Sequence, residues 1–312
     1  MALDARRQPG SAFKPFVLAT ALKEFVSPDA TYYYSRNLRI DYEGEVYEVR
    51  NYDGVERGRI PLSLAMAESD NSVHVQLALD LGLENVTETA AAMGVTTPVD
   101  PYPATAIGGL GTGVSALEMA SAYATFAASG IHREPYAVEL VEKFNFGESE
   151  SVYDHKLEGR RVLSGNQAAV GTEVLRRVVR SGTASFYHDL NSEIGRPSAG
   201  KTGTTDDFVD AWYVGYTPRL STAVWVGYPE GHKPMLDVHD ESVVNGETLP
   251  MDIWSAYMAE ATAGDPVLEF PRPDRHEFVP LFRGYAVNPA PALGGIPSRV
   301  IPPPRERRAG PG

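Results

Sequence analysis

A change in hydrophobic period well past the middle of this 312-residue chain constrains its fold more than any other feature. Before the change, apolar residues recur at helical spacing in several separate segments. The helices that this spacing predicts cover residues 11–25, 62–66, 73–81, 86–93, 116–128 and 167–180. From Ala199 onward, residues such as Trp212 and Val214 alternate with smaller or more polar neighbours, which is the period of a β-strand. We therefore expect an α+β fold.

The alternating part of the sequence predicts paired strands. These strands are expected at residues 201–205, 211–216 and 222–228. Residues 217–220 (Thr-Pro-Arg-Leu) predict a hairpin turn between the last two strands. A last helix is expected at residues 250–261. Residues 27–60 lack a long period and predict irregular structure with short strands, and one further strand is expected at residues 137–146.

The C-terminal part of the chain is rich in proline. Beyond Asp265 prolines accumulate, and the chain nears its end with Ile301-Pro302-Pro303-Pro304. Such a composition predicts an extended or disordered tail. We therefore expect a folded domain over residues 1–262 and a partly disordered extension over residues 263–312.

Composition and charge argue against several functional classes. Hydrophobic residues make up 43% of the chain, which is enough to bury a sizeable core. Asp and Glu outnumber Lys and Arg by 41 to 28, and the net charge of −13 argues against nucleic acid as a partner. The absence of Cys excludes thiolate catalysis and cysteine-ligated zinc, and the His residues form no His-Glu-x-x-His metal pattern. The chain has no apolar run long enough for a membrane anchor or signal peptide.

The segment Ser11-Ala12-Phe13-Lys14 can provide a nucleophile and its base. On a helix, residues three apart lie on one face, so the Lys14 amine can take the proton of the Ser11 hydroxyl. A lysine with its ordinary pKa of about 10.4 cannot act as a base at neutral pH, so burial or a second cation must lower the pKa of Lys14. The same spacing recurs at Ser198 and Lys201, but there it runs into a predicted strand, which makes Ser198 a poor candidate.

Two further segments carry polar groups that suit a catalytic cleft. Ser69-Asp70-Asn71 lies in a polar break between two predicted helices, where a helix cap is the ordinary alternative. Lys201-Thr202-Gly203-Thr204-Thr205 begins the strand-rich part. On a strand, Thr202 and Thr204 share a face and could hold one carboxylate, while Gly203 would let a substrate backbone lie close. The alternative here is an edge strand protected by a lysine.

Together the three segments resemble a known family. Ser-x-x-Lys, Ser-Asp-Asn and Lys-Thr-Gly in this order are typical of penicillin-binding proteins and serine β-lactamases. Longer stretches resemble the transpeptidase domain of class A, bifunctional penicillin-binding proteins over roughly residues 5–262. These stretches are residues 7–15, Asn51-Tyr52-Asp53-Gly54, residues 113–120 and residues 200–218. The resemblance implies an antiparallel sheet flanked by helices, with an all-helical subregion.

The resemblance also implies a role for each motif residue. Ser11 would attack the penultimate D-alanine carbonyl of a peptidoglycan stem peptide, with Lys14 as general base. Ser69 would relay a proton to the leaving amine, Asn71 would hold the substrate amide, and Lys201 would supply positive potential.

Substrate binding is implied for the third motif, and no metal or cofactor is needed. Thr202, Gly203 and Thr204 would bind the D-alanyl-D-alanine terminus, with the backbone N–H groups of Ser11 and Thr204 as the oxyanion hole. The implied partners are stem peptides and β-lactam antibiotics, and the implied location is the outer face of the bacterial cytoplasmic membrane.

The sequence leaves three alternatives and one departure from the family. A non-catalytic penicillin sensor and a D,D-carboxypeptidase remain open. A β-lactamase-like hydrolase would need a Glu-x-x-x-Asn between the second and third motifs, but the only such spacing is Glu241 to Asn245, after the third motif. Only ten residues precede Ser11, whereas relatives carry an anchor, a glycosyltransferase domain and the first sheet strands there. We therefore expect a domain that lacks its first strands, has an exposed sheet edge and is impaired.

Overall fold

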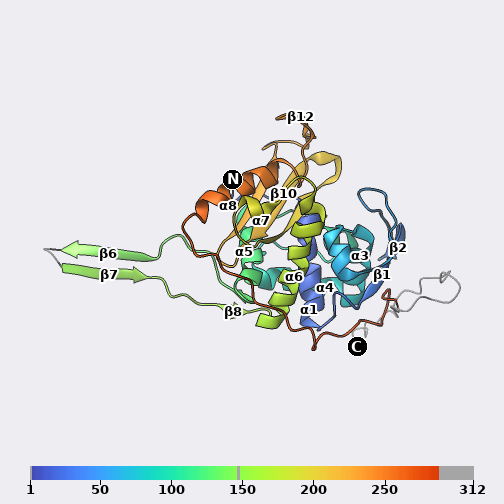
Figure 1. Cartoon of the computed structure of the whole chain (residues 1–312), viewed down its shortest axis with the longest axis horizontal. Coiled ribbons are helices and arrows are strands. Elements are labelled where there is room, and N and C mark those ends of the chain that lie inside the picture. The colour runs from blue at the N-terminus through green and yellow to red at the C-terminus, as the bar shows by residue number, and fades with distance from the viewer. Residues whose placement is uncertain (1, 146–147, 288–312) are drawn as a thin grey trace, which may run out of the picture.

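Helix α1 (Lys14–Lys23) lies at the centre of the helical part of the protein, and every residue from Lys14 to Leu22 is buried. The computed structural model describes residues 2–145 and 148–287 (Figure 1). Because the α1 sequence is apolar on nearly all sides, this helix needs neighbours around its whole circumference. The helices that contact it are α3 (Asn71–Leu81), α4 (Leu83–Met93) and α6 (Gly165–Ser181).

The predicted helices are confirmed, with changes at their ends. Besides those around α1, they are α2 (Leu62–Ala67), α5 (Ala116–Ala127) and α8 (Leu249–Ala261). The helix predicted to begin at Ser11 starts instead with a 3₁₀ turn, η1 (Gly10–Phe13), which leads directly into α1. The remaining helical segments are short: η2 (Pro103–Ile107), η3 (Thr183–Ser185), α7 (Leu190–Glu193) and η4 (Asp206–Phe208).

A three-stranded antiparallel sheet forms the other half of the core. It consists of β9 (Ala199–Thr204), β10 (Asp210–Tyr216) and β11 (Ser221–Gly227), in the order β11-β10-β9. Strand β10 is buried along its whole length because helices cover both of its faces. Tyr213 packs edge-on against Trp254 of α8, whereas Tyr216, on the opposite face, packs against Tyr123 of α5. The predicted α+β fold with a helix-flanked antiparallel sheet is thus confirmed.

Short two-stranded pairs make up the rest of the strand structure. They are β1 (Tyr32–Ser35) with β4 (Gly58–Pro61), β2 (Leu38–Tyr42) with β3 (Glu45–Val49), β5 (Ile131–His132) with β8 (Arg160–Arg161), and β12 (Leu236–Val238) with β13 (Glu241–Val243). The first two pairs confirm the short strands expected in residues 27–60. The single strand expected at residues 137–146 is instead one arm of a hairpin, β6 (Leu140–Asn145) and β7 (Glu148–Asp154), that projects from the body (Figure 1). The charged sequence of β7 gave no strand signal because both of its faces are exposed.

The C-terminal segment up to residue 287 lies against the body of the protein. Val279 forms a bridge with Val26, and the Val287 N–H donates to the Tyr32 carbonyl. Up to residue 287, the segment predicted as an extended tail is therefore held against the body by hydrogen bonds. The prediction for residues 288–312 lies outside the described residues. The division at residue 262 remains a proposal.

Strand β11 has one open edge. Within the described ranges no strand pairs with its outer side, and all its residues are half-exposed.

None of the helices in the described ranges has the length and apolar character needed to cross a bilayer.

Candidate active site

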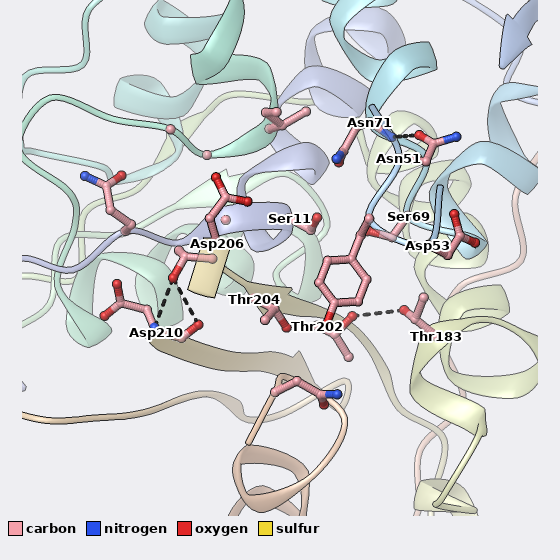
Figure 2. A pocket seen from close by; sticks show the side chains of 18 of the residues that line it. Ser11, Asn51, Asp53, Ser69, Asn71, Thr183, Thr202, Thr204, Asp206 and Asp210 are labelled. Carbon is pink, nitrogen blue, oxygen red and sulfur yellow. Dashed lines mark hydrogen bonds between the residues drawn. The ribbon is translucent and has the colours of Figure 1, made fainter. Parts of the chain in front are cut away.

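Ser11 lies where the start of the central helix meets the edge of the sheet. It sits in η1, which packs directly on β9. Gly10 has a φ of +51°, and a Cβ there would lie 2.6 Å from the Thr204 carbonyl oxygen, so only glycine allows this approach. Ser11 itself is half-buried and faces the cavity (Figure 2).

Lys14 lies one turn further along, and its side chain is completely buried. Its Nζ is 3.0 Å from Ser11 Oγ, 3.1 Å from Ser69 Oγ and 2.7 Å from Asn71 Oδ1. Burial, and next the charge of Lys201, hold the pKa of Lys14 well below its usual value. These are the two conditions under which a lysine can act as a base near neutral pH.

The second motif forms the turn between α2 and α3. Ser69 has a left-handed φ of 55°, and this turn directs its hydroxyl toward both lysines. Asp70 caps α3 by accepting the N–H of Val73 at 2.9 Å. The capping interpretation therefore holds for Asp70, whereas Ser69 and Asn71 contact Lys14.

Asn51 fixes this turn from the neighbouring loop. Its Oδ1 accepts the N–H of Asn71 at 2.8 Å, and its Nδ2 donates to Asp70 Oδ2 at 2.8 Å. Asn51 belongs to a segment that resembles the family, but no role in the site was predicted for it. Only the resemblance pointed to Asn51, because its hydrogen bonds join segments that are separate in the sequence and meet only in the folded protein.

The third motif supplies the second cation and the opposite wall. Lys201 is completely buried, and its Nζ donates to Ser69 Oγ at 3.0 Å and to Thr202 Oγ1 at 3.2 Å. Burial lowers the pKa of Lys201 to about 7. The Ser69 hydroxyl thus lies between two lysine amines whose pKa values are both lowered.

The motif residues border a cavity of about 1160 Å³. Ser11, Ser69, Asn71, Thr202 and Thr204 face it, and Thr183 supports Thr202 through a 2.9 Å contact between the two hydroxyls (Figure 2). Such a volume suits a peptide more than a single amino acid.

Gly203 and Ser198 both serve the packing of the fold. Gly203 was expected to admit a substrate backbone, but a Cβ there would lie 2.3 Å from the Pro9 carbonyl oxygen, so packing of η1 on β9 already requires the glycine. Ser198, the rejected second serine, is completely buried and bonded to Asn191 Oδ1 at 2.9 Å.

Carboxylates on the cavity wall were not anticipated. Asp53 and Glu68 pair with Arg57, and Asp210 accepts the indole N–H of Trp225 at 2.8 Å. Glu247 also lines the cavity, and burial raises its pKa to about 7. No group of His, Asp and Glu side chains in the described part of the chain is arranged to hold a metal.

A half-buried serine with a buried lysine one turn away, a second serine between two lysines and a threonine-lined strand form the arrangement typical of active-site-serine penicillin-binding proteins and β-lactamases. The family model of the penicillin binding protein transpeptidase domain matches residues 1–232. The chain belongs to this family, in agreement with its resemblance to the class A proteins. The matched stretch is the transpeptidase domain of a penicillin-binding protein.

Known relatives are bacterial penicillin-binding proteins. Penicillin-binding protein 1A of Aquifex aeolicus is 35% identical over 273 residues, which are 87% of this chain and 35% of the relative. Penicillin-binding protein 1F of Bacillus subtilis is 36% identical over 231 residues, 72% of this chain and 31% of the relative. The structure of PonA1 from Mycobacterium tuberculosis in complex with penicillin V is 29% identical with a TM-score of 0.71, covering 86% of this chain and 73% of that one. The chain thus spans about a third of the length of these curated relatives.

Proposed function

We propose that this chain is a serine D,D-transpeptidase that forms an acyl-enzyme through Ser11 and is inhibited by β-lactams. The observation that carries the proposal is the 3.0 Å contact between Ser11 Oγ and Lys14 Nζ, in a place where Lys14 is buried beside a second lysine. A neutral Lys14 amine accepts the Ser11 proton while Oγ attacks the penultimate D-alanine carbonyl.

The proton then moves to the leaving group. Ser69 lies 3.1 Å from Lys14 Nζ and faces the cavity, so it passes the proton from Lys14 to the amine nitrogen as the C–N bond breaks. The terminal D-alanine leaves, and the peptide remains as an ester on Ser11. An amine from a neighbouring stem peptide attacks this ester, and its proton returns through Lys14 to Ser11 Oγ. No metal or cofactor enters these steps.

Substrate binding is assigned to strand β9, on one wall of the cavity, and to the turn between α2 and α3. The hydroxyls of Thr202 and Thr204 bind the terminal carboxylate beside the positive charge of Lys201, and Asn71 holds the substrate amide. The backbone N–H groups of Ser11 and Thr204 stabilise the developing oxyanion, a device worth about 2.7 to 4 kcal/mol per donor. The proposed location is the outer face of the bacterial cytoplasmic membrane, where stem peptides are cross-linked.

Labelled penicillin tests the proposal directly. Wild-type protein should acquire a covalent label on Ser11, and Ser11→Ala should acquire none. Ser198→Ala, which alters the other Ser-x-x-Lys serine, is the matched control and should label normally as long as it folds. A folded wild-type protein that is never acylated contradicts the proposal.

Turnover separates the proposal from its alternatives. A transpeptidase should release D-alanine from a D-alanyl-D-alanine peptide and join the rest to an added amine. A sensor would stay acylated: it would release at most one D-alanine per protein molecule and would pass the peptide neither to the amine nor to water. A carboxypeptidase or β-lactamase-like hydrolase would transfer the acyl group to water even when the amine is present.

A further inference from the structure

Glu247 occupies a fixed position beside the proposed carboxylate-binding threonines. The preceding residue, Gly246, packs directly on the sheet. A Cβ there would be 2.7 Å from the carbonyl oxygens of Gly203 and Trp212, so only glycine fits at this position. The Gly246 N–H donates to Thr204 Oγ1 at 3.0 Å, and the Glu247 N–H donates to Asn245 Oδ1 at 2.7 Å. Glu247 therefore directly follows a residue that is hydrogen-bonded to Thr204, and this bond fixes the position of its backbone.

The surroundings of Glu247 are unusual for a carboxylate. Asp53 and Glu68, which also line the cavity, are paired with Arg57. Lys201 on β9 favours ionisation of Glu247, and Glu247 in turn helps to raise the pKa of the Tyr52 phenol in the loop after β3. Asp206 and Asp207 of η4 line the same cavity.

Lys201 consequently has two competing counter-ions. Its ammonium group contacts Thr202 Oγ1, where the proposed function places the terminal carboxylate of the substrate. Glu247 favours the charged form of the same lysine from the cavity wall. Two carboxylates near one cation repel each other, and the energetically cheaper state is one in which one of them binds a proton.

We propose that Glu247 sets the selectivity of the cleft for ligands with a terminal carboxylate, by competing with that carboxylate for Lys201. This inference rests on the proposed function and deepens it. When a carboxylate ligand binds, Glu247 takes up a proton from solvent. Because the pKa of Glu247 is about 7, its protonated form is already present at pH 6. At pH 8 Glu247 is ionised, and the free energy needed to protonate it weakens binding of the carboxylate ligand.

The test compares two probes that differ only in the carboxylate: benzylpenicillin and its methyl ester. The second-order acylation rate constant of the whole chain is measured for each at pH 6 and pH 8, and their ratio gives the carboxylate preference. The ester reports all effects of pH on the chemistry at Ser11, Lys14 and Ser69, so these cancel in the ratio. In wild type the ratio should fall between pH 6 and pH 8, by up to about tenfold per pH unit.

Glu247→Gln should make the fall between pH 6 and pH 8 shallower, because only the loss of the Lys201 charge then remains. Glu247→Asp, which keeps the charge, should retain the fall, and Glu88→Gln on the exposed face of α4 is the matched control. Removing Glu247 lowers the pKa of Lys201, so if Lys201 alone were responsible, Glu247→Gln would show an equal or steeper fall. That result overturns the inference. If neither probe acylates the wild type, the proposed function itself fails; if both do and the ratio ignores Glu247, only the inference fails.

Discussion

Asn51 Oδ1 accepts the backbone N–H of Asn71 at 2.8 Å and so joins the loop after β3 to the turn that carries Ser69. The other end of the same amide donates to Asp70 at 2.8 Å. One buried side chain thus fixes the position of a whole motif relative to Lys14.

Asn51→Ala should weaken both the fold and the proposed reaction. It leaves the Asn71 N–H without this partner, which costs about 1–3 kcal/mol of unfolding free energy. A shift of the turn by about 1 Å should slow acylation by up to about 100-fold. Urea unfolding and penicillin acylation rates measure the two effects, and Asn37→Ala, an exposed position nearby, serves as control. An unchanged acylation rate would show that Asn51 does not position Ser69.

Lys14→Arg should abolish acylation by placing a permanent positive charge beside Ser11. A guanidinium group stays protonated at all accessible pH values, so it cannot accept the Ser11 proton, and the rate should fall by at least about 100-fold. Lys23→Arg, at the exposed end of the same helix, should acylate normally. Thermal unfolding confirms that each variant is folded. Wild-type rates in folded Lys14→Arg would exclude Lys14 as the base.

Lys201→Met should change how stability depends on pH. Folded Lys201 ionises at a pKa of about 7, whereas an unfolded lysine stays protonated up to about pH 10. The unfolded state therefore binds more protons between these values, and the wild-type unfolding free energy rises with pH in this window. The wild type should gain about 1 kcal/mol or more over the variant between pH 7 and pH 9. Denaturant unfolding at several pH values measures the difference, and parallel curves would contradict the prediction.

Asp80→Ala should release the C-terminal segment from the body. Asp80 accepts hydrogen bonds from the Tyr33 hydroxyl and the Tyr285 N–H at 2.9 Å and from the Ala286 N–H at 3.2 Å. Losing these acceptors should cost about 1–3 kcal/mol and raise the population of the open segment about tenfold or more. Limited trypsin digestion after Arg283 measures this opening. Asp41→Ala, at an exposed position, should be cleaved like wild type, and equal cleavage of Asp80→Ala would show that other contacts hold the segment.

Sequence patterns predicted helices and strands correctly where a buried face produces a regular spacing of apolar residues. The helices around α1 and the strands β10 and β11 follow from apolar spacing, because burial of those faces stabilises them. The hairpin of β6 and β7 was only half anticipated, because its second strand buries no face and leaves no periodic signal. The carboxylate at Glu247 had no signal at all, because its setting is created by β9 and the loop at Tyr52, which are far away in the sequence.

The sequence by itself determined the residue types, their order and the one-turn spacing of Ser11 and Lys14. Helical geometry brings that pair together without help from the rest of the chain. Only the tertiary structure decided that Ser69 lies within 3.1 Å of both lysine amines and that both lysines are fully buried. The physical reason is that a pKa depends on the solvent and charges around a group, and these come from segments that meet only when the chain folds.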